Sequence, residues 1–225
     1  MKRGYAGYWG LRSAAGHQPT LVSFGVFVTL IAWCGFHLGF ASLASASGGQ
    51  VIVATLIASA ASGLSALLFY RVFYGAAGFH TTLYGVIGGL VASSSCATSL
   101  DPLNAVVVAA IAGVRVVLAT SLIEKLGIDD AGGAIPAHLF CGFWGVTAVA
   151  FFGPAEMRGV EGLKTQLVGG FALGGSAFVI GLVLFKLIDN LFGLRVSEGE
   201  QLLGSDFNEH SLNAYPEFEN TEDPV

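Results

Sequence analysis

The sequence predicts an all-α, polytopic membrane protein with no separate soluble domain. The first observation is composition: 54% of the 225 residues are hydrophobic and 11% are charged, whereas an ordinary soluble domain carries about 25% charged residues. The second is a series of long apolar runs, each near the ~20 residues that a spanning helix needs. The third is the 32 glycines, which suit close packing of membrane helices through small residues.

Six apolar runs qualify as transmembrane helices, and short links join them. They cover residues 19–42, 51–73, 81–98, 103–123, 135–152 and 165–192. Ser93, Ser94 and Ser95 interrupt the third run. The sixth run is long enough to tilt or to protrude past the headgroups. Residues 1–18 are expected to be a cytosolic lead-in without the pattern of a secretory signal, and residues 193–225 form an acidic tail.

The basic residues predict how these six spans are oriented. With a cytosolic N-terminus, six spans return the C-terminus to the cytosol. Seven basic residues then fall on or near the cytosolic side: Lys2, Arg3, Arg12, Arg71, Lys125, Lys186 and Arg195. Arg158 and Lys164 lie outside, and Arg115 lies within a span, where it needs a salt bridge or must snorkel to an interface. We therefore expect a multi-pass protein of the plasma or inner membrane with both termini in the cytosol.

Charge and composition argue against several functions. The net charge is −5 and the acidic residues gather in the tail, which argues against nucleic acid as a partner. Cys34, Cys96 and Cys141 fall inside apolar runs without metal-ligand spacing, so we interpret them as small packing residues. The sequence contains no recognisable nucleophile–base pair or metal cluster. We therefore expect neither an enzyme nor a bound cofactor or metal.

One polar stretch stands out among the apolar runs. Residues 127–145 read GIDDAGGAIPAHLFCGFWG, with the pair Asp129 and Asp130 followed after eight residues by His138. A histidine at lipid depth is costly and usually faces a bundle interior or a pore. The alternative is a neutral ring that hydrogen-bonds to a backbone carbonyl of a neighbouring helix. Asp129 and Asp130 precede a helix, so capping and interaction with the helix dipole explain them better than acid–base catalysis.

Helical spacing predicts the surroundings of His138. Cys141, Gly142 and Gly145 follow it by three, four and seven positions, so on an α-helix they share its face. They are small enough to leave room beside the ring. The sequence thus predicts that the ring faces the bundle interior near mid-membrane.

Four segments, in the same order along the chain, resemble the ammonium transporter/Rhesus family. They are the Asp129–Asp130 pair with His138, KLIDNLFGLRVSEGE at residues 186–200, GSDFNEHSLNAY at residues 204–215 and AWCGFHLGF at residues 32–40. The chain as a whole resembles the C-terminal half of such a transporter. That half comprises the second of two inverted repeats, the final helix and the cytosolic tail.

The resemblance implies transport of ammonium or ammonia through a narrow apolar pore in each subunit of a trimer. His138 corresponds to the second of two pore histidines, and Phe36 to one of two gating phenylalanines on the same concave surface. Trp33 and His37 are candidate pore-lining residues. A packed aromatic on a helix face is the simpler alternative for Phe36. The first pore histidine belongs to the other half of such a transporter, so the chain would either pair with a separately encoded N-terminal half or be a fragment of a longer transporter.

The tail motif carries a further implication. By resemblance, Asp206, His210 and Tyr215 dock the tail against the cytosolic ends of the helices of their own or a neighbouring subunit.

Several positions depart from the family pattern. His37 stands where the family has an asparagine, Phe40 where it has a serine, Gly133 where it has an aspartate and Ser95 where it has a proline. These departures keep a second hypothesis open. In it the chain is a degenerate, non-conducting relative with a structural or sensing role through its cytosolic tail.

Overall fold

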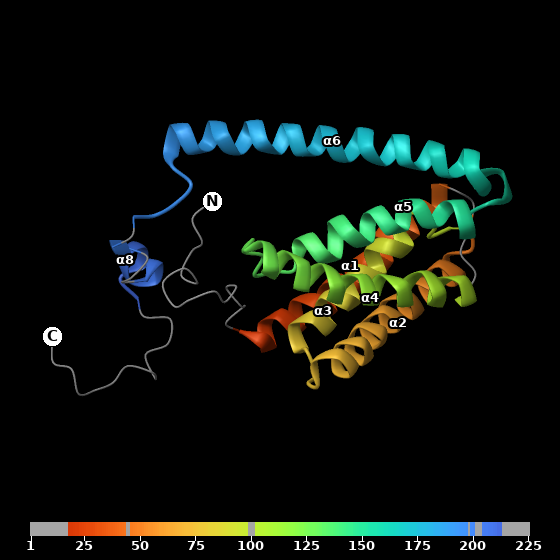
Figure 1. Cartoon of the computed structure of the whole chain (residues 1–225), viewed down its shortest axis with the longest axis horizontal. Coiled ribbons are helices and arrows are strands. Elements are labelled where there is room, and N and C mark those ends of the chain that lie inside the picture. Colours follow the sequence, from red (N-terminus) through yellow and green to blue (C-terminus); the bar gives the residue numbers. More distant parts are fainter. Residues whose placement is uncertain (1–17, 44–45, 99–101, 198, 201–203, 213–225) are drawn as a thin grey trace. The chain divides into compact units, whose positions relative to one another are not determined.

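The computed structural model describes residues 18–43, 46–98, 102–197, 199–200 and 204–212. Every regular element in these ranges is a helix, as the sequence predicts. The chain divides into two units between Leu173 and Gly174. The first unit contains the bundle of helices α1 to α5 (Figure 1).

The helices follow the predicted apolar runs. In chain order they are α1 (Pro19–Leu43), α2 (Gly48–Tyr74), α3 (Phe79–Ser94), α4 (Pro102–Leu126), the π-helix η2 (Ile135–Phe140), α5 (Cys141–Phe152), the 3-10 turn η3 (Ala155–Met157), α6 (Gly159–Phe192) and α8 (Ser205–His210). Among the described residues, five helical stretches are long and apolar enough to cross a membrane: α1, α2, α4, η2 with α5, and α6. The protein is therefore a multi-pass membrane protein.

Helix α3 is shorter than the predicted third span over residues 81–98. It ends at Ser94 after 16 residues, a length of about 24 Å against the ~30 Å of hydrocarbon in a bilayer. The hydroxyls of Ser93 and Ser94 both donate to the carbonyl oxygen of Leu90, at 3.0 and 2.8 Å. Such bonds compete with the helical ladder, and residues 95–98 form turns instead.

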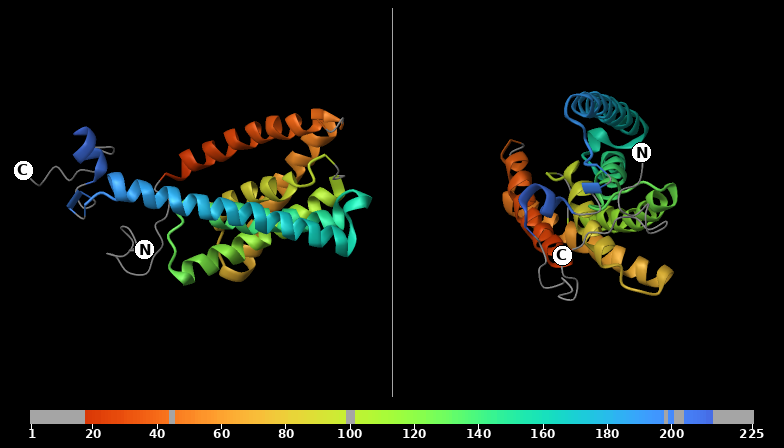
Figure 2. Two further views of the ribbon diagram at one scale, coloured as in Figure 1. Left: turned by 90° about the horizontal axis from the view of Figure 1, so that it is seen from above. Right: turned by 90° about the vertical axis from the view of Figure 1, so that its left-hand side faces the viewer.

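Small residues let α3 approach its neighbours closely. It packs against α2, α4, η2 and α5. A Cβ atom at Gly89 would lie 2.5 Å from the carbonyl oxygen of Ala58 in α2, and one at Gly85 would lie 2.6 Å from Cβ of Ala66. Either contact would force the helices apart, which explains glycine at both positions. By contrast, α1 lies at the margin of the bundle (Figure 2), and most of its side chains are exposed.

The direction of α3 follows from its neighbours. Tyr70 near the end of α2, Phe79 at the start of α3 and Glu124 near the end of α4 line one cavity. These ends therefore meet at one end of the bundle, and α3 runs antiparallel to α2 and α4. Although α3 is short, it carries the chain back along the bundle between two longer helices.

Arg115 has an aromatic partner inside the bundle. Its guanidinium carbon lies 5.9 Å from the ring centroid of Trp144 in α5, and the indole N–H of Trp144 donates to the carbonyl oxygen of Val108 at 2.8 Å. Within the described ranges Arg115 forms no ion pair. The sequence suggested a salt bridge or snorkelling, and the structure gives a cation–π contact instead.

The second unit begins within α6 and includes α8. Helix α6 ends at Phe192, and the next residue, Gly193, has a φ of 75°, which glycine adopts readily. Beyond it, the backbone N–H of Ser197 donates to Glu200 Oε2 at 2.7 Å and the N–H of Glu200 donates to Ser197 Oγ at 3.3 Å, a reciprocal capping box. Hydrogen bonds from the side chain and backbone of Ser197 hold the pKa of Glu200 below its usual value.

Candidate pore face

Helix α1 and η2 bring three aromatic or imidazole rings together. The ring centroid of Trp33 lies 5.8 Å from that of Phe36 and 6.4 Å from that of His138. Phe36 is 52% exposed, His138 is also exposed, and Trp33 is half-buried. These three residues form one exposed surface of the first unit, which we call the Phe36–Trp33–His138 face.

The α1 part of this face follows from helical spacing. Trp33, Phe36 and Phe40 are separated by three and four positions, so they share one stripe of the helix. The ring centroids of Phe36 and Phe40 lie 5.0 Å apart in an edge-to-face arrangement. The aromatic stripe therefore extends one helical turn beyond Phe36.

The π-helix changes the surroundings predicted for His138. Cys141 and Gly145 do not share its exposed face. The Cys141 thiol is buried and donates to the carbonyl oxygen of Ala112 at 3.5 Å, and a Cβ at Gly145 would lie 2.5 Å from the carbonyl oxygen of Ala92. A π-helix holds more residues in each turn than an α-helix, so spacings of three, four and seven no longer mark one face.

Asp130 holds the start of the helical segment that carries His138. Its two carboxylate oxygens accept hydrogen bonds from the backbone N–H groups of Ala134 at 2.9 Å and Ile135 at 2.8 Å. These N–H groups stand at the N-terminal end of η2, where a negative charge is favourable. Asp129 is exposed beside it.

His37 lies inside the bundle, behind the exposed face: its ring centroid is 5.7 Å from that of Phe36 and 6.5 Å from that of Trp33. Its side chain is 1% exposed. Nδ1 lies 2.7 Å from Thr55 Oγ1 and Nε2 lies 2.9 Å from Ser94 Oγ. The candidate pore-lining role of His37 therefore does not fit its position, because both ring nitrogens bond to neighbouring helices.

A small polar network surrounds His37 and reaches Trp33. The indole N–H of Trp33 donates to Ser94 Oγ at 3.0 Å, so Trp33 and His37 share Ser94. The hydroxyl of Thr55 also lies 2.7 Å from the carbonyl oxygen of Val51, to which it donates. Thr55 and Ser94 were not expected as partners, because nothing in the sequence pairs positions so far apart.

The tail residues belong to the second unit. Asp206 and His210 lie in α8. Tyr215 lies outside the described residues. The structure thus brings Phe36, Trp33 and His138 together and leaves the docking of the tail as a prediction.

Comparisons with known proteins agree with the helical architecture. A family model described as the Ammonium Transporter Family matches residues 6–215. An "Ammonium transporter Amt2" of Methanocaldococcus jannaschii is 32% identical over 90% of this chain and 48% of its own length. An "Ammonium transporter" of Mycobacterium tuberculosis is 33% identical over 88% of this chain and 45% of its own length.

A solved structure shares the fold. The "Sensor Amt Protein" superposes with a TM-score of 0.79 and 28% identity, over 86% of this chain and 50% of that one. The chain thus spans about half the length of the curated relatives it matches.

Proposed function

Because the chain belongs to the ammonium transporter family, we propose that it supplies one side of a pore that conducts ammonium or ammonia across a membrane. The observation that carries this proposal is the Phe36–Trp33–His138 face. An imidazole that faced hydrocarbon would be costly, so a ring exposed on a membrane bundle needs a covering surface or a pore beside it.

The chemistry of this face suits a small cation that gives up its water and its proton. Desolvation of an ammonium ion costs several kcal/mol even after relaxation. The π-faces of Phe36 and Trp33 offset part of that cost. Desolvation also lowers the pKa of an amine, which favours neutral ammonia and leaves the proton with water at the mouth of the pore. The His138 imidazole then offers a hydrogen bond to the polar species without becoming charged.

The other side of the pore would come from a second polypeptide segment. Since the chain covers 48% of the Methanocaldococcus relative, a separately encoded or separately supplied N-terminal half is the partner that we propose for this face. Assembly of the complete pores into a trimer is part of the same proposal. Lipid would surround the assembly.

A specific observation favours a second candidate function. Phe40 and Phe36 lie edge to face at 5.0 Å, so a bulky ring occupies the position at which the family resemblance places a serine. Such a surface would bind an external cation less well, because it offers no hydroxyl oxygen. In this alternative the chain is a non-conducting relative with a structural or sensing role.

Uptake measurements separate the two candidates. Cells that lack their own ammonium transporters would express this chain with and without a segment that supplies the first half. We expect uptake of methylammonium only when both are present, and a clear loss with His138→Ala. Phe24→Ala is the matched control, because Phe24 lies on α1 and is 65% exposed but outside the face. Absence of uptake in every combination would favour the non-conducting candidate.

A further inference from the structure

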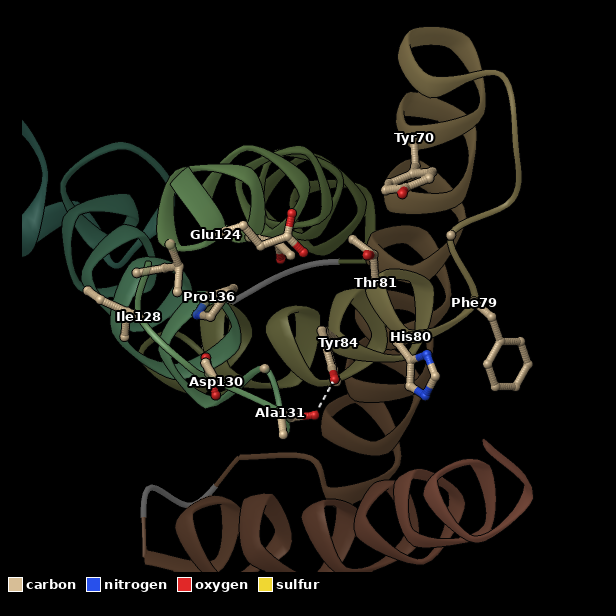
Figure 3. Close-up of a pocket in the computed structure, with 14 residues that line it drawn as sticks. Tyr70, Phe79, His80, Thr81, Tyr84, Glu124, Ile128, Asp130, Ala131 and Pro136 are labelled. Carbon is tan, nitrogen blue, oxygen red and sulfur yellow. Dashed lines mark hydrogen bonds between the residues drawn. The ribbon is translucent and has the colours of Figure 1, made fainter. Parts of the chain in front are cut away.

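A cavity of about 270 Å³ lies at the end of the bundle where α2 and α4 end and α3 and η2 begin. Figure 3 shows side chains from α2, α3, α4 and the segment before η2 arranged around it. Phe36, Trp33 and His138 do not line this cavity. It is therefore separate from the proposed pore face.

The lining of the cavity combines aromatic rings with acidic groups. Tyr70, Phe79 and Tyr84 supply rings, and Glu124 and Asp130 supply carboxylates. Neither lysine nor arginine is found among the described residues that line it. Aromatic faces and carboxylates both attract cations.

Two of the four hydroxyl groups of the lining, those of Tyr84 and Thr120, donate their protons to backbone carbonyl oxygens. Tyr84 donates its O–H to the carbonyl oxygen of Ala131 at 2.7 Å, as Figure 3 shows. Thr120 donates to the carbonyl oxygen of Val116 at 2.8 Å. What these oxygens still offer is lone pairs. Asp130 also keeps acceptor capacity, since each of its oxygens accepts one backbone N–H and a carboxylate has about four acceptor sites.

The environment of Glu124, whose side chain is exposed to solvent, supports a positive charge on the ligand. Within the described part of the chain its carboxylate has no hydrogen bond and no ion pair. It lies in the last turn of α4, where the negative end of the helix dipole disfavours a carboxylate. A cation in the cavity would relieve this unfavourable placement.

We propose that the cavity binds a small organic cation with a primary ammonium group, an alkylamine. The acceptors of the lining, on Glu124, Asp130, Tyr84 and Thr120, are enough for its three N–H donors. The volume is several times the ~30 Å³ that a water-sized group occupies in a liquid, so a bare ammonium ion would leave most of it empty. An alkyl chain would fill that space against Ile123, Ile128 and Pro136, which also line the cavity.

The test is titration calorimetry of the full chain in detergent micelles with n-butylammonium chloride, against sodium chloride at equal ionic strength. We expect saturable binding at one site, weakened at least about tenfold by Glu124→Gln. Glu156→Gln is the matched control, since Glu156 is an exposed carboxylate in η3 that does not line the cavity. It should leave the affinity unchanged.

Two further variants keep the test decisive. Thr120→Val preserves shape and removes one acceptor, so it should weaken binding about twofold to fivefold even if Glu124→Gln does not fold. His138→Ala should bind like the wild type, whatever its effect on uptake. No saturable heat in the wild type, equal affinity in the Glu124 and Thr120 variants, or loss of binding in His138→Ala would each overturn the proposal. The last outcome would place the ligand at the pore face.

Discussion

The indole ring of Trp33 lies 6.4 Å from the imidazole ring of His138, although more than one hundred residues separate them in the chain. Trp33 comes from α1 and His138 from η2. The Trp33 N–H bonds to Ser94 at the end of α3. Three helical segments thus fix the position of the ring beside His138.

Replacement of Trp33 should change the environment of His138. Trp33→Ala removes the neighbouring ring, so the ring-proton resonances of His138 should shift in NMR spectra of the protein in micelles. Trp33→Phe keeps a ring and loses only the bond to Ser94, which should cost about 1 kcal/mol of unfolding free energy and shift the resonances less. Phe24→Ala on the same helix should leave them in place. Identical His138 resonances in all variants would contradict the contact.

His37 should be important for stability. His37→Ala leaves a cavity and deprives the Thr55 and Ser94 hydroxyls of their ring partners. We expect a loss of about 2–4 kcal/mol in unfolding free energy. His210→Ala in the exposed helix α8 should cost less than about 0.5 kcal/mol. Thermal unfolding followed by circular dichroism would measure both, and equal midpoints would refute the buried network.

Gly133 and Gly132 provide a matched pair of substitutions. Gly133 has a φ of +64°, and a Cβ there would collide with the ring of Tyr84. Gly133→Ala should therefore cost about 2–4 kcal/mol. Gly132→Ala meets no atom within 4 Å and should be nearly neutral. In the Tyr84→Ala background the collision is absent, so Gly133→Ala should destabilise the protein less than it does in the wild type. If it destabilises both equally, the loss of unfolding free energy comes from backbone strain alone.

The number of crossings can be tested from the C-terminus. We propose six crossings with both termini in the cytosol, on the basis of the seven-to-two distribution of basic residues. A C-terminal reporter that is active only outside the cytosol should then stay inactive. An active reporter would mean that α3, at 16 residues, does not count as a crossing or that the orientation is reversed. An N-terminal reporter would tell these apart.

The tail should resist proteolysis when the membrane part is assembled. Docking of Asp206, His210 and Tyr215, as the tail motif implies, would shield the chain beyond residue 200. We expect cleavage of the tail at least about tenfold slower in the assembled protein than after denaturation, because the docked backbone is less available to a protease. His210→Ala should accelerate cleavage if that side chain takes part. Cleavage at the rate of an unstructured peptide would rule out docking.

Contiguous apolar runs made most helices predictable from the sequence. The start of α1 at Pro19 and the stretch from Ile135 to Phe152 coincide with the predicted ranges. The predicted end of the third span lies four residues beyond the end of α3. Hydropathy alone does not reveal that the hydroxyls of Ser93 and Ser94 donate to the carbonyl oxygen of Leu90.

The site was less predictable than the helices. The spacing rule for His138 failed because it assumes an α-helix, whereas η2 is a π-helix. The partners of His37 depend on how three helices meet, which a single sequence does not encode locally.

The contact between Gly133 and Tyr84 also bears on how this sequence can change by mutation. A side chain at position 133 and a ring at position 84 exclude each other. Aspartate tolerates the left-handed backbone better than most residues, so the ring is the main obstacle to an acidic residue at position 133. A lineage with this pair would have to lose the ring first and gain the carboxylate second, and the reverse order would pass through a destabilised intermediate. The two positions are therefore epistatic, and substitution at position 84 before position 133 is the more accessible order.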